Sequence, residues 1–205
     1  MTVGIARRTL FGVALALSSG LVLGGCQSQT GWHATDVSGA VPALQLSMTR
    51  TRDGKSVSAA DYRGKVILLY FGYANCPDVC PLTLSNVGRV LRQLGPAADR
   101  VRVLFVTVDP NRDTPAILNQ YAAAFGPQVD ALRGDPNQLA SLARRYRVAY
   151  SVDPHGGTGG TYQVTHSSGI YVFDRDGEAR LLISSLSTAK PDIDGTASDL
   201  RALLR

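Results

Sequence analysis

Two cysteines and their neighbours are the part of the sequence best suited to chemistry. Cys76 and Cys80 lie in the segment Asn75-Cys76-Pro77-Asp78-Val79-Cys80-Pro81, between a continuous apolar run and a predicted helix. The amino end of a helix presents unpaired N–H groups and the positive end of the helix dipole, which lower the pKa of a nearby thiol. Because the thiolate both attacks disulfides and binds metals, the position favours either chemistry.

The CxxxC spacing discriminates between these two uses. In a regular helix, residues four apart share a face with their Cβ atoms about 5–6 Å apart. A disulfide needs Cβ atoms about 3.8 Å apart, so Cys76 and Cys80 can form one only if the first turn is irregular. The same pair can chelate a metal without strain.

A protein metal site needs more than two sulfurs, and His166 is the strongest candidate for a third ligand. It precedes a predicted strand over 169–173, which in a thioredoxin-like sheet lies beside the strand that leads into the cysteines. Two thiolates and one imidazole suit Cu(I), and with further ligands Cu(II); Zn²⁺ is also compatible. The alternative is that Cys76 and Cys80 form a redox pair and that His166 packs or hydrogen-bonds. His33 and His155 are expected to be exposed.

The elements that must position these residues alternate between strands and helices. Strands are predicted at 66–71, 101–108, 169–173 and 181–185, and helices at 82–94, 115–125, 136–147 and 192–204. The glycine-rich stretch within Tyr150–Thr165 predicts an inserted loop or hairpin before the histidine. The fold class is therefore α/β and thioredoxin-like, with a central mixed sheet flanked by helices.

The amino-terminal residues have the layout of an export signal. Arg7 and Arg8 precede an uncharged stretch that ends in Leu-Gly-Gly-Cys at Cys26, which resembles the lipobox of bacterial lipoproteins. We expect a signal peptide over 1–25, a lipidated Cys26 with a flexible tether over 26–40, and a domain over 41–205. The alternative is an uncleaved helix. The expected location is the extracytoplasmic face of a bacterial cell envelope, on the membrane.

Composition excludes several other classes of protein. The chain has 205 residues and a net charge of +5, with its basic residues scattered rather than clustered as nucleic-acid binding requires. Three cysteines are too few for a disulfide scaffold.

Three ordered motifs resemble the Sco/SenC family, whose members are membrane-tethered, copper-binding proteins of the thioredoxin superfamily. The motifs are YFGYANCPDVCP at 70–81, VDPNRDTP at 108–115 and YQVTHSSGIYVFDRDG at 162–177. The resemblance implies that Cys76, Cys80 and His166 bind copper and that Asp109 is the acidic residue near that site. One departure is Thr165, where many relatives carry Asp next to the histidine.

The resemblance also implies a function as a copper metallochaperone for cytochrome c oxidase. Its partners would be the copper-bearing subunit of the oxidase and a thiol reductant. A rival interpretation is an extracytoplasmic thiol-disulfide oxidoreductase or peroxidase, an enzyme with Cys76 as nucleophile and Cys80 as resolving cysteine. The usual CxxC spacing is absent, and His166-Ser167-Ser168 stands where such enzymes place a cis-proline. A copper sensor or storage lipoprotein is the other alternative.

Overall fold

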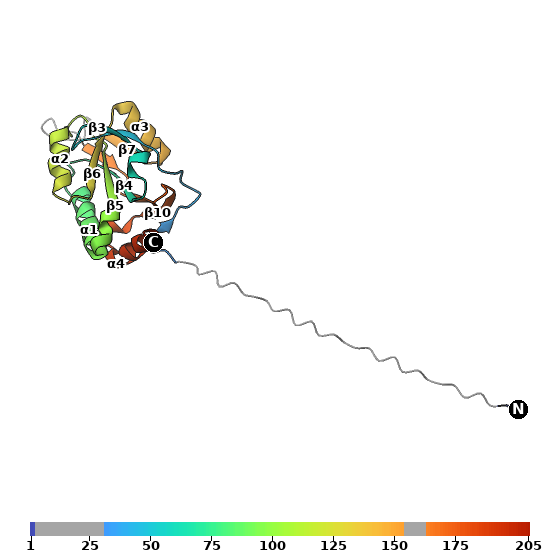
Figure 1. Ribbon diagram of the computed structural model, residues 1–205. Coiled ribbons are helices and arrows are strands. Elements are labelled where there is room, and N and C mark those ends of the chain that lie inside the picture. Colours follow the sequence, from blue (N-terminus) through green and yellow to red (C-terminus); the bar gives the residue numbers. More distant parts are fainter. Residues whose placement is uncertain (3–30, 154–162) are drawn as a thin grey trace. The chain divides into compact units, whose positions relative to one another are not determined.

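The computed structural model describes residues 1–2, 31–153 and 163–205 (Figure 1). All the described helices and strands belong to one compact unit, Trp32–Arg205, which holds the hydrophobic core. The expected signal peptide, Cys26, and His155 with its glycine-rich segment lie outside the described residues. In the part of the chain that is described, no helix combines the length and the apolar character needed to cross a membrane.

An eight-stranded mixed sheet forms the centre of the domain. In spatial order its strands are β1 (Thr35–Asp36), β10 (Ala179–Ile183), β9 (Ile170–Phe173), β4 (Val66–Gly72), β5 (Val101–Thr107), β6 (Val129–Arg133), β2 (Ser47–Arg50) and β3 (Lys55–Ser58). The β4–β5 and β5–β6 pairs are parallel and the other pairs are antiparallel. This arrangement confirms the predicted mixed sheet.

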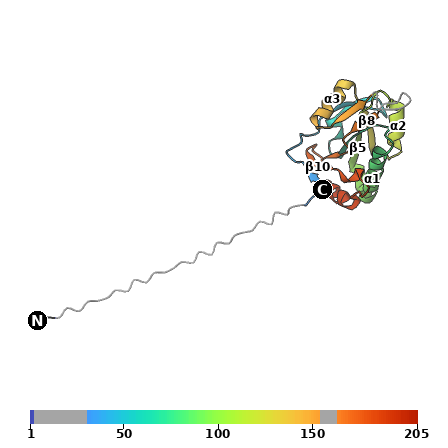
Figure 2. The same ribbon diagram turned by 180° about the vertical axis from the view of Figure 1, so that it is seen from behind.

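Four α-helices cover the sheet, and short 3₁₀ turns connect several elements. The helices are α1 (Val79–Leu94), α2 (Pro115–Ala123), α3 (Pro136–Arg145) and α4 (Ile193–Leu203), and the 3₁₀ turns are η1 (Ala59–Tyr62), η2 (Gly95–Arg100) and η3 (Ser185–Ser187). Helix α1 packs against α4, and α3 lies at the other end of the domain (Figures 1 and 2). The predicted helices are all present, with small differences at their ends.

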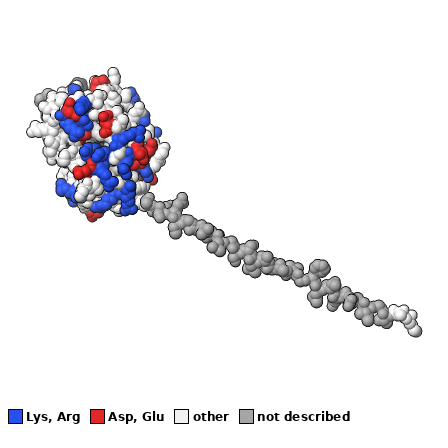
Figure 3. Space-filling view, viewed as in Figure 1, with Lys and Arg blue, Asp and Glu red and all other residues white. Residues whose placement is uncertain are grey.

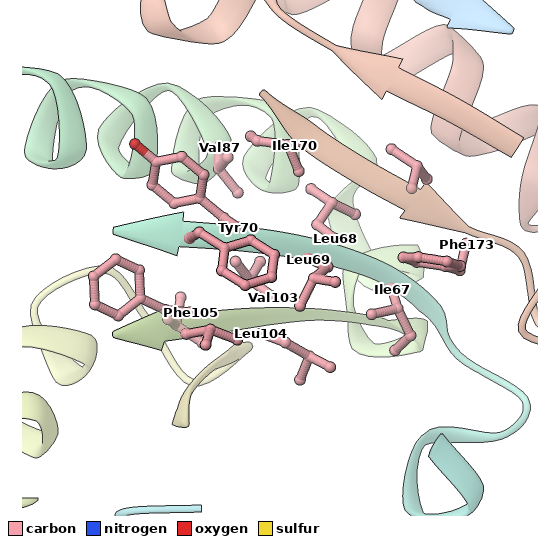
Figure 4. Packing of buried hydrophobic residues seen from close by; sticks show 14 of the residues in the cluster. Ile67, Leu68, Leu69, Tyr70, Val87, Val103, Leu104, Phe105, Ile170 and Phe173 are labelled. Carbon is pink, nitrogen blue, oxygen red and sulfur yellow. The ribbon is translucent and has the colours of Figure 1, made fainter. Parts of the chain in front are cut away.

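Strand β4 is the centre of the core and leads directly to the cysteines. All seven of its residues are buried, as a continuous apolar run predicts for a strand covered on both faces. Figure 4 shows the side chains of Leu68 and Tyr70 among neighbours from β5, β9 and α1, with Phe105 and Val87 close by. The end of β4 is therefore a rigid base for whatever follows it.

The expected tether over 26–40 is wrong for its described part. Strand β1 pairs with β10, placing Thr35 opposite Leu182. The backbone N–H of His33 donates to the carboxylate of Asp199 in α4, and the His33 ring lies 3.3 Å from a carboxylate oxygen of Asp192. This segment belongs to the domain because it satisfies the otherwise open edge of β10.

Several strands were not predicted from the sequence. The β2–β3 hairpin and β6 are missing from the expected elements, and two strands lie where an insertion was expected. These are β7 (Tyr150–Asp153) and β8 (Gln163–His166), which form a separate antiparallel hairpin. The predicted insertion before the histidine is therefore a hairpin that carries His166 on its second strand.

Candidate metal centre

The structure brings Cys76, Cys80 and His166 together. Their ligand atoms all lie within 4.8 Å of one another. The Sγ atom of Cys80 is 3.2 Å from Nε2 of His166, and the backbone N–H of Cys80 points to Sγ of Cys76 over 3.4 Å. Both cysteines are free thiols. The three predicted ligands thus converge from the turn after β4, the start of α1 and the end of β8.

Cys76 lies in the turn before the helix rather than on it. Its backbone N–H donates to the carbonyl of Tyr73, and α1 begins three residues later at Val79. The two cysteines therefore do not share one face of a regular helix. Instead, the first turn of α1 supplies a backbone N–H to the Cys76 sulfur, which uses one of the N–H groups that a helix start leaves unpaired.

Cys80 is fully buried, and Gly72 makes room for it. A Cβ atom on Gly72 would lie 2.9 Å from the Cys80 sulfur and 2.6 Å from a ring carbon of Phe105. Burial raises the pKa of the Cys80 thiol to about 12, so this sulfur carries a proton at neutral pH in the metal-free protein. Cys76 is the more exposed of the two sulfurs.

His166 is oriented by the backbone that follows it. Its Nδ1 lies 3.0 Å from the carbonyl oxygen of Ser167, so Nδ1 carries the proton in the tautomer that satisfies this carbonyl. The Nε2 lone pair then faces the sulfur of Cys80. Burial lowers the pKa of His166, which keeps the imidazole in the neutral form that binds metals. The hydroxyl of Thr165, the residue before His166, forms a hydrogen bond across the hairpin with the hydroxyl of Ser151.

Tyr73 connects the predicted acidic residue to the candidate ligands. Its ring meets the His166 ring edge-on, with centroids 5.8 Å apart, and the guanidinium of Arg112 lies 5.9 Å from the centre of the Tyr73 ring. Arg112 forms an ion pair with the buried carboxylate of Asp109. Asp109 thus reaches the cluster through Arg112 and Tyr73. Sequence reasoning missed Tyr73, although it stands within the cysteine motif.

A second buried carboxylate fixes the loop that carries Cys76. Asp113 accepts hydrogen bonds from the backbone N–H of Ala74, at 3.0 Å, and from the hydroxyl of Thr107, at 2.5 Å. Desolvation is the main cause that raises the pKa of Asp113. The cap of α2 is the next residue, Thr114, whose hydroxyl accepts a hydrogen bond from the backbone N–H of Ile117.

A pocket of about 340 Å³ opens beside the cluster. Its lining includes Cys76 and His166 together with the apolar side chains of Pro77, Val79 and Val164. Cys76 and His166 are therefore reachable from outside, while Cys80 lies behind them. The arrangement can hold a soft metal ion at the surface of the domain and present it to a partner.

Comparison with known proteins agrees with this geometry. The sequence profile described as SCO1/SenC matches residues 47–204. Among curated proteins, "Protein SCO2 homolog, mitochondrial" of Bos taurus is 43% identical over 126 residues, which are 60% of this chain and 47% of that protein. The chain thus spans about half the length of the first curated relatives that it matches.

Solved structures show the same fold. ScoI of Bradyrhizobium japonicum, with copper bound, is 36% identical with a TM-score of 0.70, over 80% of this chain and all (100%) of that one. Apo Sco1 of Thermus thermophilus is 34% identical with a TM-score of 0.70, over 85% of this chain and 100% of that one. These matches confirm the predicted thioredoxin-like fold. Since the SCO1/SenC profile matches more than half of this chain, the chain belongs to the SCO1/SenC family.

Proposed function

We propose that this chain is a copper metallochaperone that carries its copper on Cys76, Cys80 and His166 and assists assembly of the copper centre of cytochrome c oxidase. The observation that carries the proposal is the convergence of two thiols and one imidazole within 4.8 Å. A related structure with copper bound supports copper as the cargo. The acceptor is proposed to be the copper-bearing subunit of the oxidase.

The donor set fits copper on chemical grounds. Two thiolates and a neutral imidazole are soft and borderline ligands that suit Cu(I), and with an added ligand they also suit Cu(II). Binding must displace the proton of Cys80, and the metal charge compensates the cost of a buried thiolate. The partial exposure of Cys76 and His166 leaves a side from which an acceptor can approach.

The proposal includes an anchor and a reductant. Acylation of Cys26 would hold the domain at the extracytoplasmic face of a bacterial membrane. In that oxidising environment, the two sulfurs must be reduced before they bind copper, so a thiol reductant is required as a partner. The lipobox-like sequence before Cys26 supports the anchor.

A copper titration tests the ligand set. The reduced protein is expected to bind one copper and, with Cu(II), to show thiolate-to-copper absorption. His166→Ala should lose this absorption and most of the affinity, because one of three ligands is removed. His33→Ala is the matched control, since that ring pairs with Asp192 instead of the cysteines. Unchanged affinity and absorption in His166→Ala would contradict the proposal.

A thiol-disulfide oxidoreductase is the second candidate. The unequal burial of the sulfurs favours it, because the more exposed Cys76 suits a nucleophile and the buried Cys80 suits a resolving cysteine. The position of His166, with its Nε2 atom 3.2 Å from the Cys80 sulfur, argues for metal binding instead. Rapid disulfide exchange with little copper retention in the same samples would favour the enzyme.

A further inference from the structure

A second pocket, of about 480 Å³, lies at the end of the domain away from the metal centre. Its charged and aromatic lining consists of Arg63, Arg175, Arg180, Arg205, Asp174, Asp176 and Trp32. The carboxyl end of α4 also contributes to it. Figure 3 shows Lys and Arg side chains gathered over the part of the domain that carries α4. The pocket therefore combines an aromatic ring with an excess of positive charge.

Three of the four arginines, Arg205 among them, are exposed and form no ion pair with the residues that the structure describes. Arg180 forms an ion pair with Asp174 and lies 6.0 Å from the centre of the Trp32 ring. Arg63 and Arg175 are exposed, and within the described ranges their guanidinium groups form no ion pair. A backbone hydrogen bond from Gly64 to the carbonyl of Arg175 holds the two segments together. Guanidinium groups suit the geometry of a phosphate, and Arg63 and Arg175 line the same pocket.

The sheet topology places this pocket and the metal centre at opposite ends of β4. Arg63 and Gly64 come just before β4, whereas Cys76 comes after it. Strand β9 runs antiparallel to β4 with Phe173 opposite Ile67, so the turn that contains Arg175 lies at the same starting end. At about 3.3 Å per residue, the strand separates the two sites by roughly 20 Å.

The pocket must also lie close to the proposed anchor. Trp32 is the sixth residue after Cys26, and six residues of chain span at most about 20 Å. If Cys26 carries lipid in the bilayer, Trp32, which lines the pocket, lies within about 20 Å of the membrane surface. A half-buried tryptophan beside arginines is a combination that favours the headgroup region of a membrane.

We propose that this pocket binds the phosphodiester headgroup of an anionic phospholipid through Arg63 and Arg175, and so holds the domain with its metal centre facing away from the membrane. This inference rests on the proposed acylation of Cys26. The pocket has more arginines than aspartates, and the negative charge of the headgroup would balance the excess positive charge. Copper would then be presented to an acceptor that projects from the membrane.

Trp32 is the single tryptophan of the chain, so its fluorescence reports on the pocket directly. The test uses residues 26–205 with Cys26→Ser, which contain the whole compact unit and carry no acyl group. Vesicles of phosphatidylcholine, with and without phosphatidylglycerol, are added, and fluorescence and co-sedimentation are measured. We expect binding and a blue shift only with phosphatidylglycerol, weakened by added salt because the attraction is electrostatic.

The double variant Arg63→Gln/Arg175→Gln should bind these vesicles about 30-fold more weakly, at about fivefold for each basic residue. Arg89→Gln/Arg144→Gln is the matched control, because it removes the same charge from exposed arginines outside the pocket. It should bind within about threefold of the parent chain.

Equal losses of vesicle affinity in the two double variants would overturn the proposal, since binding would then depend only on the overall charge of the protein. A fluorescence change that saturates with inorganic phosphate, without vesicle binding, would show that the pocket binds free phosphate. That result would overturn the proposal of a lipid headgroup as the ligand. Copper stoichiometry measured on the same samples separates this result from failure of the proposed function. Mass spectrometry of membrane-bound full chain tests acylation of Cys26 separately.

Discussion

The burial of Cys80 determines how the sulfur pair responds to its surroundings. With no exposed surface, this thiol is protected from solvent oxidants and holds its proton, and only a ligand that supplies positive charge at the sulfur favours its ionisation. Cys76 and His166 form the accessible side of the cluster. A metal therefore binds from the exposed side of a partly buried cluster.

Gly72→Ala is expected to disturb both packing and metal binding. The added Cβ atom would meet the Cys80 sulfur at 2.9 Å and the Phe105 ring at 2.6 Å, so one of them must move. We expect the free energy of unfolding to fall by about 1–3 kcal/mol, as in other overpacked cores, and copper affinity to fall with it. Chemical denaturation and a copper titration measure the two effects.

Gly88→Ala is the matched control for this substitution. Gly88 lies within α1, and a Cβ atom there would contact only a guanidinium nitrogen of Arg92, at 3.6 Å. Alanine should stabilise the helix by about 0.5–1 kcal/mol and leave copper binding unchanged. Equal behaviour of the two variants would mean that the close approach at Gly72 has no role.

Copper affinity is expected to rise with pH. Because the pKa of Cys80 is raised to about 12, its thiol is protonated at neutral pH, and copper must displace that proton. Each proton released makes the apparent affinity about tenfold higher for each unit of pH. Protonation of His166 competes with the metal less than that of an ordinary histidine, since burial lowers the pKa of its ring.

Competition titrations with a copper(I) chelator of known pH dependence measure this slope between about pH 6 and pH 8. His33→Ala should give the same slope as the parent chain. A flat profile after correction for the chelator would show that Cys80 keeps its proton and does not bind the metal.

The sequence was sufficient to place the three candidate ligands together but not their supports. Cys76, Cys80 and His166 are chemically distinctive, and their order along the chain indicates which strand ends they follow. Gly72 and Asp113 are common residue types whose roles depend on which side chains pack against them. Those neighbours are known only once β4, β5 and α1 are placed.

At the level of elements, the turn between β4 and α1 is held by hydrogen bonds to Asp113, a residue in the segment that follows β5. Asp113 joins the N–H of Ala74 to the hydroxyl of Thr107, which is the last residue of β5. The cysteine turn is therefore fixed to the sheet at both strands. This bond explains how a short irregular segment can keep Cys76 within reach of the other ligands.

Asp113→Ala should loosen this turn. It leaves the Ala74 N–H and the Thr107 hydroxyl without their acceptor, which we expect to lower the free energy of unfolding by about 2–4 kcal/mol. Faster hydrogen exchange at Ala74 and weaker copper binding should accompany the loss. Asp78→Ala removes the same charge from an exposed side chain of this turn that caps no N–H, and its cost should stay below about 1 kcal/mol. Equal losses of unfolding free energy in Asp113→Ala and Asp78→Ala would contradict the proposed role of Asp113 in holding the turn.

Elements with apolar or well-capped sequences could be predicted, whereas β6 and the β2–β3 hairpin could not. Strand β6 contains Asp130, whose buried carboxylate pairs with Arg52 at 2.8 Å. A charge within a short run breaks the apolar pattern from which buried strands are predicted. The β2–β3 hairpin is mostly polar because it lies at the edge of the sheet, and so it resembles a loop in sequence.

At the scale of the whole molecule, the segment that begins at Trp32 fixes where the chain leaves the domain. Asp199 accepts hydrogen bonds from the backbone of His33 and Ala34, and β1 extends the sheet beside β10. The sequence suggested a tether here because its residues are small and polar. Their attachment depends on a buried carboxylate that lies about 165 positions later along the chain, and local patterns do not contain that information.

Cys26→Ser is expected to move the protein from the membrane fraction to the soluble extracytoplasmic fraction. Acyl chains contribute about 0.8 kcal/mol for each buried CH₂ group, far more than a weak headgroup contact adds. Copper stoichiometry should not change, because Cys76, Cys80 and His166 all lie within the compact unit that begins at Trp32. Cell fractionation and a copper assay on each fraction measure the two effects, with Cys76→Ser as the control that keeps the anchor and loses copper. If Cys26→Ser stays in the membrane fraction, residues 1–25 act as an uncleaved span, and the domain is held by that span instead of by lipid.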